Sequence, residues 1–245
     1  MALRLGTALS YFWQVRSHTH EGWTFLERAL ERSEGVAVAV RAKALNAAGD
    51  LAMELGNHDR GEELCQQSLA LLRESGDVAG VGDALHNLGM TSWAKGEMAT
   101  ARVRFEESLK ISTETGNKNR MAWSLWFLSN VDMLQGDYPQ GYSHAEAGLL
   151  LFRERGNSRL IAYSLAQIAW GYLEEGDTVK AYPLFEESYA LFKEIGDKAL
   201  ARLALWGLGW VAFQQGKIAL ARSLLEEAST TFQGEESPDN LENQA

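Results

Sequence analysis

Glycines at a fixed interval constrain this chain more than any other sequence feature. One series recurs every 40 residues and a second falls midway between its members, so that a glycine stands every 20 residues from position 56 to position 216. The two series are Gly56, Gly96, Gly136, Gly176 and Gly216, and Gly76, Gly116, Gly156 and Gly196. Self-similarity of this kind indicates a repeat protein, in which each repeat buries its apolar face against its neighbours.

The residue after most of these glycines is an aspartate or an asparagine, which predicts a helix start. Glycine adopts the left-handed conformation that closes one helix, and the Asp or Asn side chain accepts hydrogen bonds from the free N–H groups of the next. We therefore expect helices of about 15 to 17 residues, joined by tight turns and antiparallel to their neighbours. The expected capping residues are Asn57, Asp77, Asn117, Asp137, Asn157, Asp177 and Asp197.

The aligned copies resemble the tetratricopeptide repeat (TPR). Segments such as "HNLGMTSWAKGEMATARVRFEESLKI" and "WGLGWVAFQQGKIALARSLLEEASTT" carry a Leu-Gly pair, then a small residue opening the second helix, then a large apolar residue. The usual TPR unit has about 34 residues, so these copies are long variants. The resemblance implies an all-α, right-handed α-solenoid of about six helical hairpins with a 40-residue period. Pro183 departs from the pattern, because it lies deep enough in its helix to kink it or delay its start.

The repeat predicts one TPR superhelix over residues 1–233. Its expected units are about 1–35, 36–76, 77–116, 117–156, 157–196 and 197–233, the first of them with a one-residue deletion. Residues 234–245 are polar, and we expect them to form a disordered tail.

A closer resemblance covers nearly the whole chain. Forty-residue copies carrying "LHNLG", "ARVRFEESL" and "FRERGN" are similar to the C-terminal TPR region of bacterial STAND ATPases, including LuxR-type and AfsR-type transcriptional regulators and relatives of the maltose regulon activator. In that family a nucleotide-binding module precedes the repeats, which act as a sensor or regulatory surface. The sequence holds no P-loop GxxxxGK[ST] motif, so the resemblance implies the repeat part alone or a free-standing relative.

Charge and composition exclude several classes of partner. The formal net charge is −10, which argues against a nucleic acid, whose phosphates require a basic face. The apolar runs are too short for a membrane span, and the opening residues lack the features of a signal peptide. Cys65 is the only cysteine, so no intramolecular disulfide can form. We therefore expect a cytoplasmic protein.

The sequence offers no convincing catalytic or metal site. Adjacent glutamates such as Glu106 and Glu107 point about 100° apart on a helix and cannot share a proton. We expect them on the solvated outer face, where neighbouring bases such as Arg104 balance their charge. His18 and His20 lack a third metal ligand. We expect no enzyme, no metal and no cofactor.

The TPR resemblance implies a binding groove, because the first helix of each hairpin lines the concave side in that family. Its groove-facing positions are polar near the N-terminus and aromatic from Trp93 onward. Helical spacing alone also puts Trp123, Trp126 and Asn130 on one stripe. The candidate ligand- or peptide-binding residues are Asp50, Asp83, His86, Trp93, Trp123, Trp126, Asn130, Tyr163, Gln167, Trp170, Trp206, Trp210 and Phe213.

Two alternatives stay open at these positions. Aromatic stripes at helical spacing are often core, so each tryptophan is as readily structural as ligand-binding. Asp132, next to the stripe, is either solvated at a loosened interface or faces a ligand, and the first is favoured because an unpaired aspartate is rarely buried.

The leading hypothesis is a non-catalytic module that binds a protein or peptide segment in the groove, as the sensor or regulatory part of a bacterial signalling ATPase or transcriptional regulator. A small-molecule sensor that stacks a sugar or an aromatic metabolite on the same tryptophans is the alternative. A structural scaffold that self-associates through its end helices, for example as a homodimer, is the third possibility.

Overall fold

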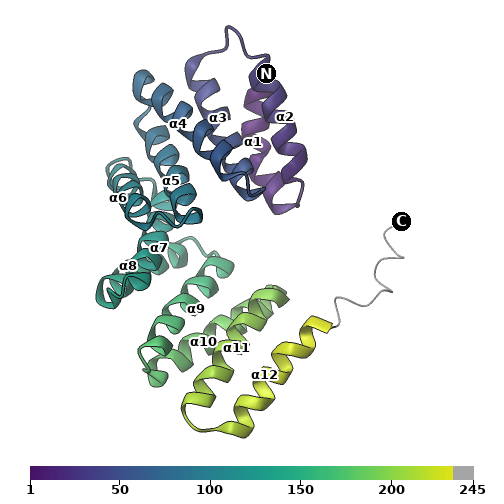
Figure 1. Cartoon of the computed structure of the whole chain (residues 1–245), viewed down its shortest axis with the longest axis vertical. Helices are drawn as coiled ribbons and strands as arrows, with labels where there is room; N and C mark the ends of the chain where they lie inside the picture. Colours follow the sequence, from purple (N-terminus) through teal and green to yellow (C-terminus); the bar gives the residue numbers. More distant parts are fainter. Residues whose placement is uncertain (234–245) are drawn as a thin grey trace. The chain divides into compact units, whose positions relative to one another are not determined.

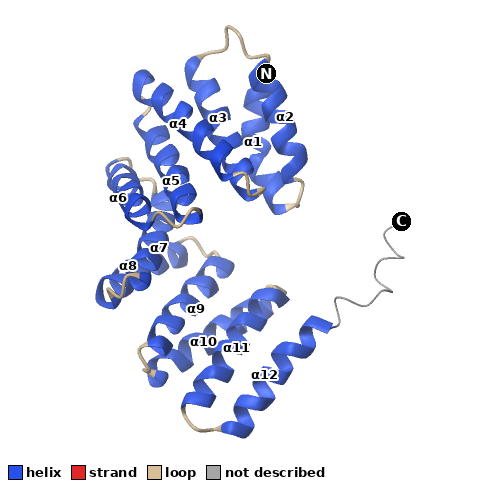
Figure 2. Ribbon diagram, viewed as in Figure 1, coloured by secondary structure: helices blue, strands red, loops and turns tan. Residues whose placement is uncertain are grey.

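The structure is a computed structural model that describes residues 1–233. Within this range it contains twelve α-helices and no strand (Figure 2). The helices are α1 (Ala2–Val15), α2 (Thr19–Glu31), α3 (Val38–Glu54), α4 (His58–Ser75), α5 (Val78–Ala94), α6 (Met98–Glu114), α7 (Lys118–Leu134), α8 (Tyr138–Glu154), α9 (Ser158–Glu174), α10 (Thr178–Glu194), α11 (Lys198–Gln214) and α12 (Ile218–Gln233) (Figure 1). The expected all-α fold of helical hairpins is confirmed, whereas the expected polar tail lies outside the described residues.

The chain divides into two compact units. The N-terminal unit comprises residues 1–131, with α1 to α6 and most of α7. The C-terminal unit begins at Asp132 and contains the end of α7 and α8 to α12. Within each unit the helices of a hairpin pack on each other, as α3 does on α4 and α9 on α10.

The turns have the predicted chemistry. Every glycine of the two series has a positive φ, between 66° and 81°. Each of the seven expected Asp and Asn caps accepts a hydrogen bond from the backbone N–H three residues further on, at 3.0 to 3.4 Å. These local interactions end one helix and start the next, which fixes the lengths of the helices.

Close contacts inside a hairpin explain the Leu-Gly pair of the repeat. A Cβ on Gly89 of α5 would lie 2.6 Å from the ring of Phe105 on α6, and Phe105 is fully buried. Gly209 of α11 meets Leu225 of α12 in the same way, at 2.8 Å. The small residue therefore lets the two helices of a hairpin approach closely around one large side chain.

A buried serine joins the two helices of three hairpins. Ser68, Ser108 and Ser188 each donate a hydrogen bond, at 2.7 to 2.8 Å, to a backbone carbonyl 26 residues earlier. The acceptors are the carbonyls of Ala42, Gly82 and Ala162. These bonds set the register of α4 on α3, α6 on α5 and α10 on α9 without leaving a buried hydroxyl unpaired.

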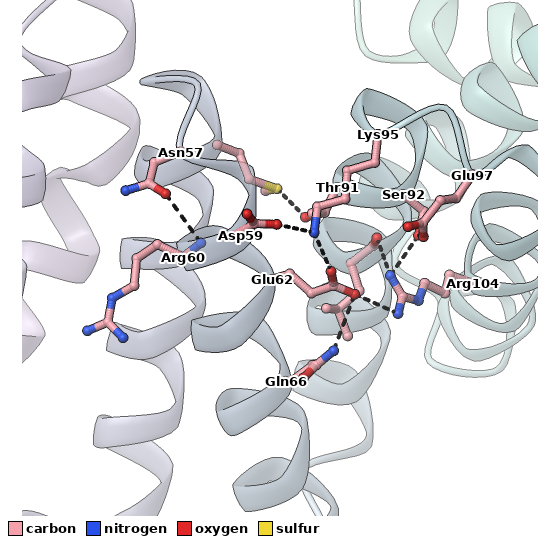
Figure 3. A network of polar contacts seen from close by, with 12 residues as sticks. Asn57, Asp59, Arg60, Glu62, Gln66, Thr91, Ser92, Lys95, Glu97 and Arg104 are labelled. Atoms are coloured by element: carbon pink, nitrogen blue, oxygen red, sulfur yellow. Dashed lines mark hydrogen bonds and ion pairs between the residues drawn. The ribbon is translucent and has the colours of Figure 1, made fainter.

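A polar network connects α4, α5 and α6 (Figure 3). Arg104 donates to the carbonyl of Leu88 at 2.9 Å, to the hydroxyl of Ser92 at 2.7 Å and to Glu62 at 3.0 Å. Lys95 donates to the other oxygen of Glu62 at 2.8 Å. Arg104, expected to balance the adjacent glutamates of the outer face, instead bridges two hairpins through its guanidinium.

Of the two effects expected of Pro183, a kink or a delayed helix start, the delayed start is not found. Helix α10 begins at Thr178 and continues through Pro183. Its first turn is held by Asp177, which accepts from the backbone N–H of Lys180 at 3.1 Å, and by Ala181, which is fully buried.

None of the helices in residues 1–233 is long and apolar enough to cross a bilayer.

Candidate binding site

The N-terminal unit contains a cavity of about 580 Å³, here called the N-terminal cavity. Its walls come mainly from α1, α3, α5 and α7, the first helices of four successive hairpins. Its lining residues are Thr7, Ser10, Tyr11, Gln14, Lys43, Asn46, Ala47, Asp50, Leu72, Asp77, Ala79, Gly80, Asp83, His86, Asn87, Met90, Asn119, Arg120, Trp123 and Phe127. The side chains are mostly polar, with aromatic rings contributed by α1 and α7.

Two of the three carboxylates in the N-terminal cavity are held by cations. Arg120 donates its Nε–H to Asp83 at 2.8 Å. The ammonium of Lys43 lies 3.3 Å from Asp77, which also caps α5 by accepting from the N–H of Gly80. This backbone hydrogen bond, followed by the hydrogen bond from Lys43, lowers the pKa of Asp77, so the group is charged at neutral pH.

Asp50, the third carboxylate, has a different environment. Gln14 donates its amide N–H to Asp50 at 3.0 Å, and among the described residues no Lys, Arg or His side chain forms an ion pair with it. Burial raises the pKa of Asp50, against the opposing effects of the Gln14 hydrogen bond and the charge of Arg120. One helical turn away on α3, the side-chain oxygen of Asn46 is buried and has no hydrogen-bond donor.

The aromatic candidates of the N-terminal unit separate into two groups. Trp123 lines the N-terminal cavity together with Phe127. Trp93 and Trp126 do not line it and pack edge-to-face on Phe127, with ring centroids 6.0 and 4.9 Å away. Trp123 belongs to the same aromatic cluster, because its ring centroid lies 6.0 Å from that of Trp126 and 6.4 Å from that of Phe127. Of the three tryptophans in this cluster, Trp123 is therefore the one that also faces the N-terminal cavity.

His86 lies at the wall of the N-terminal cavity but is a core side chain, only 2% exposed. Its ring packs edge-on against Phe105 and Phe127, and its Nδ1 lies 3.4 Å from the hydroxyl of Ser124. Burial lowers the pKa of His86 well below its usual range. The imidazole is therefore neutral at pH 7.

Asn130, predicted to offer a polar contact, is engaged with its own helix. Its amide donates to the carbonyl of Trp126 at 2.7 Å, and it does not line the N-terminal cavity. Gln167 is a partly buried side chain of α9 in the C-terminal unit.

The aromatic candidates of the C-terminal unit comprise one core side chain and four exposed ones. Trp170 packs edge-to-face on Phe185 at 5.2 Å, which is a core contact. The remaining side chains are exposed on α9 and α11: Tyr163, Trp206, Trp210 and Phe213.

Comparison with the preceding hairpin explains why α11 exposes these rings. Ala166 and Leu173 occupy the positions of Trp206 and Phe213 one repeat earlier, and both are buried in a cluster that includes Leu205 of α11. The face of α11 that carries Trp206 and Phe213 therefore corresponds to a face that, on α9, is covered by the next hairpin.

The expectation that Asp132 is solvated is wrong. Asp132 is fully buried, and its carboxylate lies 2.6 Å from Nδ1 of His144 on α8. The other ring nitrogen of His144 lies 3.1 Å from the amide nitrogen of Gln140. A close hydrogen-bonded partner is what permits the burial of this carboxylate.

Most residues that line the N-terminal cavity were not among the predicted candidates, and three of them add polar side chains from three different helices. They are Gln14 on α1, Asn87 on α5 and Arg120 in the first turn of α7. Helical spacing also puts Lys43, Asn46 and Asp50 on one face of α3, and this was a signal in the sequence for the wall that α3 contributes. No group of three or more His, Cys, Asp or Glu side chains among residues 1–233 could hold a metal ion.

The model of one protein family, described as the MalT-like TPR region, matches residues 41–244. None of the curated proteins matches the chain in sequence. Among solved structures, BtubC from P. vanneervenii is 18% identical over 97% of this chain and 93% of its own, with a TM-score of 0.75.

Two further proteins with solved structures are regulatory by their descriptions. NprR in complex with its cognate peptide NprX is 12% identical over 92% of this chain and 66% of its own, with a TM-score of 0.67, and the peptide-free protein from B. thuringiensis is described as a quorum sensor. A STAND protein with a TPR sensor from Pyrococcus horikoshii is 16% identical over 92% of this chain and 41% of its own, with a TM-score of 0.70. At these identities the likeness shows the fold, a TPR-like solenoid.

Proposed function

The chain belongs to the MalT-like TPR region family, and from this premise we propose that it is a non-catalytic regulatory module that recognises a peptide segment in its N-terminal cavity. The single observation that carries the proposal is the composition of that cavity. The first helices of four successive hairpins supply side-chain amides, charged pairs and aromatic rings to the walls of this cavity of about 580 Å³. Stacked repeats present concave surfaces of this kind to extended ligands.

The chemistry of the walls suits a peptide backbone. The side chains of Asn46, Asn87 and Asn119 each combine a hydrogen-bond donor group with an acceptor, as a peptide unit does. Trp123 and Phe127 offer apolar surface for one or two side chains of the ligand. The solved complex of NprR with NprX, which has the same fold, supports a peptide as the ligand class.

A random-sequence peptide library displayed on phage tests this function. We expect the wild-type protein to enrich related peptides, and synthetic copies of them to change the intrinsic tryptophan emission, because Trp123 lines the cavity. Trp123→Ala should weaken binding about ten-fold or more, since an aromatic anchor is lost. Trp206→Ala, which removes an exposed ring of the C-terminal unit, is the matched control and should bind normally.

Two results would refute the proposal. One is that the wild-type protein enriches no peptide. The other is that folded Trp123→Ala protein, checked by circular dichroism, binds the selected peptides as well as the wild type does.

A small-molecule sensor is the second candidate, favoured by one observation. The volume of the N-terminal cavity falls within the range of small-molecule sites, roughly 300 to 1,000 Å³. A metabolite panel containing sugars and aromatic compounds would test it by thermal shift. A panel that moves neither the melting temperature nor the tryptophan emission would count against it.

A further inference from the structure

Two unfilled acceptors lie next to each other on one wall of the N-terminal cavity. Asn46 and Asp50 are four residues apart on α3, so their side chains project from the same face of the helix. The side-chain oxygen of Asn46 is buried without a donor. The carboxylate of Asp50 receives one hydrogen bond, from Gln14. A carboxylate offers about four lone-pair positions, so Asp50 has further acceptor capacity.

The other charges of the cavity are already matched. Asp83 is held by Arg120 at 2.8 Å, and Asp77 is held by Lys43 and by a backbone N–H. Each of these bases is engaged with its own acid. The N-terminal cavity thus contains one carboxylate, Asp50, that forms no ion pair among residues 1–233, although the charge of Arg120 acts on it. Beside it lies the side-chain oxygen of Asn46, which has no hydrogen-bond donor.

Resting on the proposed function, we propose that the peptide places a hydrogen-bond-donating cation, a guanidinium or an ammonium group, between Asp50 and Asn46. Such a group supplies several N–H donors and a positive charge, which are what these two side chains lack. Trp123 and Phe127 line the same cavity, and aromatic faces also favour a cation.

The alternative ligand chemistries fit these two side chains less well. A carboxylate or phosphate would bring further acceptors to a wall that already has two unfilled ones. An apolar side chain would leave Asn46 unpaired and Asp50 without a counter-ion. Since burial raises the pKa of Asp50, an ionic partner would also restore the charged form of this carboxyl.

The cation can come from an Arg or Lys side chain or from a free N-terminus, and synthetic peptides separate these sources. For each peptide that wild-type protein selects from the library, three forms are compared by calorimetry: the parent, a form with Arg replaced by citrulline or Lys by norleucine, and an N-acetylated form. We expect one of the two modified forms to bind about ten-fold or more weakly, because a charge-assisted hydrogen bond is lost.

A double-mutant cycle assigns that loss to Asp50. Asp50→Asn should weaken the parent peptide by a similar factor and should make the protein indifferent to loss of the cation. Asn46→Asp adds a second carboxylate and should bind the parent peptide more tightly than the wild type. Glu146→Gln removes an exposed carboxylate from α8 and serves as the matched control, with unchanged binding.

The outcomes distinguish the two levels of the proposal. Two results would overturn this inference and leave the peptide-binding function standing. In one, the selected peptides bind equally well without any cation. In the other, loss of the cation lowers the affinity for the Asp50→Asn protein as much as for the wild type. Failure to select any peptide would overturn the function itself. If Asp50→Asn does not fold, Asn46→Asp still decides, because unchanged or weaker binding of the parent peptide contradicts the proposed position of the cation.

Discussion

Replacing Glu62 by glutamine should destabilise the N-terminal unit far more than its surface position suggests. Glu62 accepts from Arg104 at 3.0 Å and from Lys95 at 2.8 Å, so one carboxylate connects α4 to two residues of the following hairpin (Figure 3). Glutamine keeps the shape of the side chain. It removes the charge and turns an N–H₂ group toward one of the two cations.

The size of the destabilisation depends on how exposed the three side chains of this network are. Loss of one partner costs about 3 to 5 kcal/mol in a buried ion pair, and an exposed pair contributes about 0 to 1 kcal/mol. The side chains of Glu62, Lys95 and Arg104 are 19, 23 and 20% exposed, which lies between these limits. We therefore expect Glu62→Gln to lower the free energy of unfolding by about 2 kcal/mol.

Glu63→Gln is the matched control. The side chain of Glu63 is 55% exposed and pairs with Arg60 within the same helix. This change should cost about 0.5 kcal/mol or less. Urea unfolding at pH 7, followed by circular dichroism and fitted with a nearest-neighbour repeat model, measures both variants.

The pH dependence follows from the lowered pKa of Glu62, caused first by the hydrogen bond from Lys95. A folded-state pKa below the unfolded value stabilises the protein above the unfolded value, about 4.3, and this stabilisation is lost as the pH falls through the folded pKa. The difference in the free energy of unfolding between the wild type and Glu62→Gln should thus be constant near neutral pH and shrink below about pH 4. Equal costs for Glu62→Gln and Glu63→Gln would refute the reasoning.

Three further changes test the packing of the two units. Gly89→Ala should lower the free energy of unfolding by about 1 to 3 kcal/mol in urea titrations, because the added methyl would meet the buried ring of Phe105 at 2.6 Å; a stabilised variant would show that the ring can move. His144→Ala should lower the free energy of unfolding by about 3 kcal/mol, since it removes the close partner of the buried carboxylate of Asp132. Adding Asp132→Leu should restore part of this loss, because the unpaired buried carboxylate is then gone. A double variant less stable than His144→Ala would contradict this. Cys65 is fully buried and burial raises the pKa of its thiol, so iodoacetamide should alkylate it slowly in the native protein and rapidly in urea; rapid native labelling would contradict this burial.

The turns and helix lengths could be predicted from the sequence because their determinants are local. A left-handed glycine and a capping Asp or Asn act on backbone groups within a few residues, as Asp77 does on Gly80. The helices that surround the cavity were predicted on a different basis, namely their place as the first helices of the hairpins in a TPR-like repeat. Asp50 and Asp83 were identified in this way, and so was Trp123.

The roles of individual side chains depended on contacts between helices, which the repeat pattern does not encode. Trp93, Trp123 and Trp126 looked equivalent and all three pack on Phe127, yet only Trp123 lines the cavity. Asp132 was misjudged because its partner, His144, lies on the next helix and belongs to no repeated pattern.

The serine that joins the helices of three hairpins also bears on how the chain can change length in evolution. Each of these bonds closes within one repeat, across 26 residues, and the bonds of Arg120 to Asp83 and Arg104 to Glu62 reach only the adjacent repeat, across 37 and 42 residues. A duplication or loss of a 40-residue segment therefore rejoins the chain at an equivalent turn and breaks contacts only at one junction. Recombination in such steps would lengthen or shorten the proposed binding surface while each remaining hairpin keeps its own internal register.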